Sequence, residues 1–95
     1  PSVFFFVDSK VKIKELRKLI DKIDDQLFEL LVERFDVSIK IGDIKASKNI
    51  NIYDPNREQE IIDRLSIKLE GKLKKGDIET IIRSFYNISK KLQKK

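Results

Sequence analysis

The feature that most constrains this chain is an apolar series too long for a chain of its size to bury alone. From Leu16 onward, apolar residues recur at alternating steps of four and three, with Arg34 as the one position of the series that is not apolar: Leu16, Ile20, Ile23, Leu27, Leu30, Val37, Ile41 and Ile44. This spacing places one apolar stripe along a helix that packs lengthwise on another. No proline interrupts the stretch, and its glycine, Gly42, weakens a helix without necessarily ending it. We predict a first helix from about residue 12 to about residue 46.

The length of this helix predicts a second chain. At ~1.5 Å per residue the helix is roughly 50 Å long, whereas a compact chain of this size has a radius of gyration near ~12 Å. Two further short helices cannot cover a stripe of that length, and uncovered apolar surface promotes aggregation. We therefore predict a homodimer in which the long helix is shared between the two halves.

The rest of the chain predicts two shorter helices. Residues 48–53 lack helical periodicity and are expected to form a loop, after which Asp54 caps a helix with Pro55 at its first position. Gly71 is expected to end that helix and Asp77 to cap the next. The two apolar faces are Ile61, Ile62, Leu65 and Leu69, and then Ile78, Ile81, Ile82, Phe85, Ile88 and Leu92. The predicted fold is all-α, with three helices in one domain, residues 1–95, and residues 1–10 as an arm outside the core.

Composition narrows the chemistry. The chain has no His and no Cys, so disulfides, thiolate chemistry and a histidine proton shuttle are excluded, and no metal or cofactor is expected. Catalysis by fixed charges remains open. The net charge of +5 fits a solvated surface as well as a nucleic-acid ligand. The apolar run Val3–Val7 ends at Asp8, too early for a secretory segment, so we expect a cytoplasmic protein without a membrane span.

Polar residues interrupt the apolar stripes. Arg34 lies on the stripe of the first helix, Glu58 on that of the second and Ser89 on that of the third, with Gln93 one turn after Ser89. Each has a purely structural alternative: Arg34 sets the register, Glu58 pairs with a nearby Lys or Arg, or Ser89 bonds to its own helix. An unpaired buried charge costs several kcal/mol. We therefore expect these groups to converge on one another or on a ligand.

Two further cations bear on such a ligand. Lys45 follows Arg34 by eleven residues, which is about 20° off the same face and roughly 16 Å along the axis. Together these side chains could bracket a small anion. Arg17 lies roughly 25 Å from Arg34 on the same helix. If Arg17 serves the same site, it comes from the other subunit.

These residues resemble one known family. Leu16–Asp24, Leu30–Arg34 and Ile41–Lys45 resemble the first helix of the all-α chorismate mutases. Asp54–Glu58 resembles the second-helix signature of that family, and Ser89 with Gln93 resembles its third-helix Ser and Gln. The resemblance covers roughly residues 14 to 93. It rests on all the pieces in order, because no single piece is specific.

The resemblance implies an intertwined helical dimer that rearranges chorismate to prephenate, a [3,3] reaction without a cofactor. Arg34 and Arg57, with Arg17 of the partner subunit, would surround the carboxylates of chorismate, and Ser89 would line the carboxylate side.

The resemblance also implies which groups act on the reacting atoms. Lys45 and Gln93 would face the ether oxygen, while Glu58 and Asp54 would lie near the ring hydroxyl. The catalytic set is then Lys45, Gln93, Arg34 and Glu58. Tyr86 and Lys90 depart from the family pattern, because an aliphatic residue is expected at the first and a less polar residue at the second.

Three alternatives stay open at this point. The isochorismate pyruvate lyases share the fold, but they do not keep the adjacent Arg and Glu that stand here as Arg57 and Glu58. A non-enzymatic basic helical dimer that binds nucleic acid or protein would explain the charge, but not the interrupted stripes. A partner enzyme of aromatic amino-acid synthesis is also compatible with the sequence.

Overall fold

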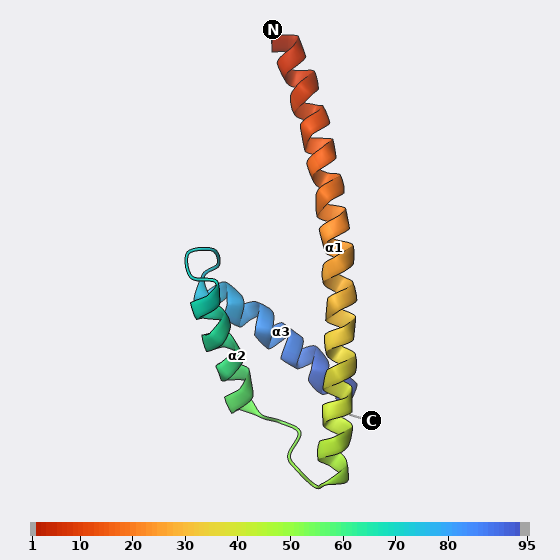
Figure 1. Ribbon diagram of the computed structural model, residues 1–95, viewed down its shortest axis with the longest axis vertical. Coiled ribbons are helices and arrows are strands. Elements are labelled where there is room, and N and C mark those ends of the chain that lie inside the picture. Colours follow the sequence, from red (N-terminus) through yellow and green to blue (C-terminus); the bar gives the residue numbers. More distant parts are fainter. Residues whose placement is uncertain (1, 94–95) are drawn as a thin grey trace. The chain divides into compact units, whose positions relative to one another are not determined.

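The computed structural model describes the backbone of residues 2–93 and the side chains of residues 9–93, and this part is all-helical (Figure 1). Helix α1 spans Ser2–Ser47, α2 spans Pro55–Lys68 and α3 spans Lys75–Gln93. The prediction of an all-α fold with three helices is confirmed for these residues. The chain divides into two compact units, residues 1–34 and residues 35–95, which are described in turn.

The first unit consists of helix alone, and its start corrects the prediction. We expected the helix to begin near residue 12, but α1 begins at Ser2 and includes most of the predicted arm. The physical reason is that residues 2–41 contain neither proline nor glycine, so nothing interrupts the backbone hydrogen bonds. The side chains of the Phe4–Phe6 triplet lie outside the described residues.

The apolar stripe of the first unit is exposed in the single chain. Leu16, Ile20, Ile23, Leu27 and Leu30 are each between 50% and 65% exposed. An exposed apolar row of this kind is typical of a helix that packs against another apolar surface. Despite its length, α1 is too polar to span a bilayer, and within residues 2–93 no helix has the length and apolar character for that.

The second unit has a core of its own. Ile61 and Ile62 of α2 pack against Ile78 and Ile82 of α3, and all four are buried. Partly buried side chains surround this core: Leu65, Leu69, Phe85 and Tyr86. The faces predicted for the two short helices are therefore confirmed at these four residues. Ile81, Ile88 and Leu92 of the predicted α3 face are more than two-fifths exposed.

The last turns of α1 also belong to the second unit. The Phe35 ring meets the Phe85 ring edge to face, with centroids 6.4 Å apart and planes at 87°. This is a favourable aromatic geometry. Gly42 does not end α1, which continues to Ser47. The predicted loop follows, with Asn49 in the left-handed region at φ 56°.

The ends of the short helices differ slightly from the prediction. Helix α2 ends at Lys68, before the expected Gly71, which adopts φ 80° in the turn beyond. Asp77 is not the N-cap of α3, because the helix already begins at Lys75. The carbonyl of Lys74 accepts the backbone N–H groups of Asp77 and Ile78 at 3.1 Å. Asp77 therefore lies in the first turn, where its charge complements the helix dipole.

Candidate active site

The start of α2 places three predicted site residues within one helical turn. Asp54 is the N-cap, and its Oδ1 accepts the backbone N–H of Arg57 at 3.1 Å. Pro55 follows at the first helical position, as predicted. The Arg57 side chain is exposed, and its Nη1 lies 3.4 Å from Glu60 Oε2. The cap thus fixes the backbone from which Arg57 and Glu58 project.

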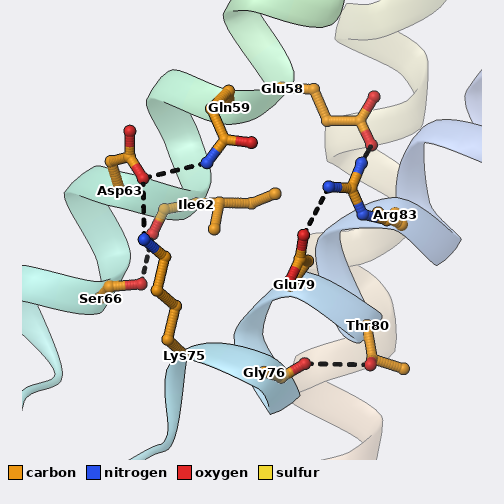
Figure 2. Close-up of polar contacts among 10 residues, drawn as sticks. All are labelled: Glu58, Gln59, Ile62, Asp63, Ser66, Lys75, Gly76, Glu79, Thr80 and Arg83. Atoms are coloured by element: carbon orange, nitrogen blue, oxygen red, sulfur yellow. Dashed lines mark hydrogen bonds and ion pairs between the residues drawn. The ribbon is translucent and has the colours of Figure 1, made fainter.

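Glu58 is buried and ion-paired. Its side chain is 8% exposed, and Oε1 accepts a hydrogen bond from Arg83 Nη1 at 3.1 Å. Figure 2 shows Arg83 of α3 between Glu58 and Glu79, and its Nη2 donates to Glu79 Oε1. The alternative that Glu58 pairs with a neighbouring cation is therefore realised. The pair also fixes the carboxylate between α2 and α3.

Arg83 was not predicted as a site residue. Its pKa is raised, first by the hydrogen bond with Glu79 and then by the charges of Glu79 and Glu58, against a lowering by desolvation. Because this pKa starts far above neutrality, Arg83 stays charged across the physiological range. The only sequence signal was Glu79 four residues before Arg83, the spacing of a helical ion pair.

Ser89 is buried without a hydrogen-bond partner. It is 4% exposed, and its Oγ has no partner among the described residues. The alternative that Ser89 bonds to its own helix is therefore not realised. A buried hydroxyl without a partner costs about 1–3 kcal/mol. Such a group is suited to meet a polar ligand atom.

Gln93 joins the end of α3 to the last turns of α1. Its Nε2 donates to the Ser38 carbonyl at 2.7 Å and lies 3.2 Å from Ser38 Oγ. Gly42 permits this approach, because a Cβ at that position would lie 2.9 Å from Gln93 Cγ. Ser38 was missed in the sequence, although it lies seven residues before Lys45 and so shares its face of α1.

The remaining predicted cations lie on α1. Lys45 belongs to the second unit and is half-buried in the last turn of the helix. Arg17 is exposed and Arg34 is half-buried, and both belong to the first unit. The second unit therefore contains Lys45 together with Asp54, Arg57, Glu58, Ser89 and Gln93.

A cavity of about 410 Å³ opens beside the end of α3. It is lined by Asn51, Ile52, Tyr53, Lys90 and Gln93. This volume lies in the range of small-molecule sites. Gln93 is the predicted site residue on its wall, whereas the loop residues 51–53 were not predicted as site residues.

The observation that decides the family is a match along most of the chain. A model of the chorismate mutase type II family matches residues 16–94. The chain belongs to that family. The match extends from before Arg17 to beyond Gln93, so it encloses every predicted site residue.

Two curated chorismate mutases are similar to somewhat more than half of the chain. The bifunctional chorismate mutase/prephenate dehydratase of Aquifex aeolicus is 44% identical over 54 residues, which is 57% of this chain and 15% of that protein. The chorismate mutase of Methanocaldococcus jannaschii is 41% identical over 54 residues, which is 57% of this chain and 54% of that protein. The matched region is thus between about one-seventh and one-half of these relatives.

The chorismate mutase fold is confirmed by a solved structure. Chorismate mutase (Form II) from Thermus thermophilus superposes with a TM-score of 0.84 at 26% identity. The superposition covers 88% of this chain and 96% of that one.

Proposed function

We propose that this chain catalyses the rearrangement of chorismate to prephenate. The observation that carries the proposal is the family match over residues 16–94, which encloses Arg17, Arg34 and Lys45 as well as the sites on α2 and α3. The reaction breaks a C–O bond as a C–C bond forms within one molecule. It transfers no proton and uses no nucleophile, so a chain without His and Cys is equipped for it.

The cations serve the two carboxylates of the substrate. Arg34 and Arg57 would bind them together with Arg17 of the partner subunit, and this clamp would hold the enolpyruvyl group over the ring. The exposed Arg57 guanidinium, with its weak contact to Glu60 at 3.4 Å, is able to turn toward a ligand. The Ser89 hydroxyl supplies a further polar contact.

Lys45 and Gln93 would stabilise negative charge that develops on the ether oxygen. Gln93 Nε2 donates to the Ser38 carbonyl at 2.7 Å and to Ser38 Oγ at 3.2 Å, so the hydrogen of the longer bond would turn from Ser38 Oγ to the substrate. Glu58, fixed by Arg83, would accept a hydrogen bond from the ring hydroxyl, with Asp54 close by. Preorganised groups of this kind need no rearrangement during the reaction.

The same proposal includes a homodimer. The exposed stripe of the first unit requires a cover, and a second copy offers an identical stripe. Arg17 would then reach the site of the other subunit. The bifunctional Aquifex aeolicus relative also suggests that this mutase works beside an enzyme that consumes prephenate.

The test is an ultraviolet assay of chorismate loss, with prephenate identified after acid conversion to phenylpyruvate. We expect turnover by the wild type and a loss of about 10²–10³ in kcat for Lys45→Ala, which removes a donor to the ether oxygen. Lys48→Ala, three residues along in the exposed turn, is the matched control and should retain wild-type kcat.

A folded, dimeric wild type without turnover would refute the proposal. Conversion of isochorismate instead would favour the lyase reaction. Salt-sensitive nucleic-acid binding without turnover would favour the non-enzymatic alternative. Near-normal kcat in Lys45→Ala would refute only the role of Lys45.

A further inference from the structure

The cavity beside α3 has a cation on its wall that the proposed mechanism does not use. Lys90 is half-buried, and its Nζ lies 4.1 Å from the centroid of the Tyr53 ring. Both residues line the cavity of about 410 Å³, together with Gln93. An ammonium group therefore lies on the same cavity wall as a residue of the proposed site.

Lys90 is positioned by helix α3, and Tyr53 by a local turn in the loop that precedes α2. Lys90 directly follows the buried Ser89 on α3 and precedes Gln93 by three residues, so Lys90 and Gln93 lie on neighbouring parts of one helix face. On the other side, Asn51 Oδ1 accepts the backbone N–H of Tyr53 at 3.2 Å. This local bond stabilises the turn that presents the ring.

The contact with Tyr53 leaves the charge of Lys90 available. Within the described part of the chain, no ion pair involves Lys90. An aromatic face attracts an ammonium weakly at a partly exposed site, whereas a carboxylate binds it more strongly. An anion that enters the cavity can therefore draw Lys90 from the ring.

We propose that Lys90 binds one of the two substrate carboxylates at this cavity, and that Tyr53 holds the side chain when the site is empty. This inference rests on the proposed function, which supplies the dicarboxylate. A substrate carboxylate keeps its charge throughout the rearrangement, whereas charge develops on the ether oxygen, so a Lys90–carboxylate contact exists equally in the ground state and in the transition state. Uniform binding of this kind lowers KM and leaves kcat unchanged.

The test compares Lys90→Met with Lys91→Met in the full chain, by steady-state kinetics with chorismate. Both changes remove one positive charge from α3, but Lys91 is exposed and does not line the cavity. We expect Lys90→Met to raise KM about ten-fold with kcat within about two-fold, and Lys91→Met to leave both unchanged. Lys90→Arg, which keeps the charge, should restore KM to within about three-fold of wild type.

Each outcome separates this inference from the proposed function. Turnover by the wild type with equal KM in both Met variants would overturn the role of Lys90 and leave the mutase proposal intact. A fall in kcat at unchanged KM in Lys90→Met would also overturn it, because carboxylate binding predicts the reverse. A wild type without turnover would overturn both. A shallower salt dependence of kcat/KM in Lys90→Met alone would support the proposal.

Discussion

Residues 1–34 and residues 35–95 bury apolar surface in different ways. The second unit closes its own core, with Ile62 fully buried between α2 and α3. The first unit is one helix, and its regularly spaced apolar side chains are half or more exposed. The comparison teaches that one chain encodes two kinds of hydrophobic surface. One is complementary to another part of the chain, and the other is, in our proposal, complementary to a second copy.

The proposed site follows the same division. Most of its residues lie in the second unit, where Asp54 caps α2, Arg83 fixes Glu58 and Ser38 holds Gln93. Arg17 and Arg34 come from the first unit. We therefore expect changes to the apolar stripe of the first unit to act on assembly and changes to Arg17 to act on the site of the other subunit. Changes in the second unit should act on folding or on chemistry within one subunit.

The largest expected effect breaks the assembly. Leu30→Lys places a charge in the predicted seam, and the two-fold symmetry of a dimer places it there twice. At about 3 kcal/mol per buried charge, the dimer dissociation constant should rise on the order of 10⁴-fold. Sedimentation velocity over a concentration series measures this change.

Val32→Lys is the matched control for that experiment. Val32 is 58% exposed, comparable with Leu30 at 65%, but it lies on the opposite side of the helix from the seam. It should leave the dissociation constant within a few-fold of wild type. Equal weakening by both substitutions would contradict the seam.

The second prediction tests whether the site is shared between subunits. Arg17→Ala and Lys45→Ala should each lose about 10²–10³ in activity as pure dimers. After the two variants exchange subunits, half of the dimers are mixed and each mixed dimer has one intact site, so activity should return to about a quarter of wild type.

The recovery depends on where Arg17 acts. If Arg17 served the site of its own chain, a mixed dimer would contain two damaged sites and activity would stay at the level of the pure variants. Mixing Lys45→Ala with Gln93→Ala is the control. Both residues belong to the second unit, so no intact site is expected to form.

The third prediction concerns the self-contained core. Ile62→Ala should lower the free energy of unfolding by about 2–5 kcal/mol, because it leaves a cavity at a fully buried position. Urea denaturation at one fixed chain concentration measures the loss. The same substitution at Ile67, which is 77% exposed on α2, should change stability by at most ~0.5 kcal/mol. A comparable loss of stability at both positions would mean that Ile67 is also buried, and that the core is not confined to the contact between α2 and α3.

The two units also differ in how well their structure could be predicted from the sequence. Hydrophobic period predicted the helices, the buried Ile61 and Ile62, and the burial of Glu58 and Ser89, since burial follows directly from position on a helical face. The predicted start of α1 near residue 12 was wrong, because nothing in residues 2–12 marks a helix boundary. The prediction that Asp77 is an N-cap was wrong, because the hydrogen bonds of the helix already begin at the Lys74 carbonyl.

The partners of the site residues were harder to predict than their burial. Arg83 reaches Glu58 across 25 positions in the chain and Gln93 reaches Ser38 across 55, so both pairs depend on how the helices pack. Lys90 is more polar than the family pattern predicts, but its contact with Tyr53 depends on a loop whose sequence has no hydrophobic periodicity. Sequence patterns identify which residues are unusual, and the tertiary structure determines what they contact.

The smallest expected effect separates two roles of Asp54. Its Oδ1 caps α2, and the proposed function also places its carboxylate near the ring hydroxyl of the substrate. Asp54→Ala removes both roles and should lower the free energy of unfolding by about 1 kcal/mol. Asp54→Asn keeps the cap, because asparagine is an equally good N-cap residue. Stability measured by thermal unfolding should therefore be retained in Asp54→Asn, while KM for chorismate should rise about three-fold. Wild-type KM in Asp54→Asn would show that Asp54 serves only to begin α2, and would leave Glu58 as the sole carboxylate assigned to the ring hydroxyl.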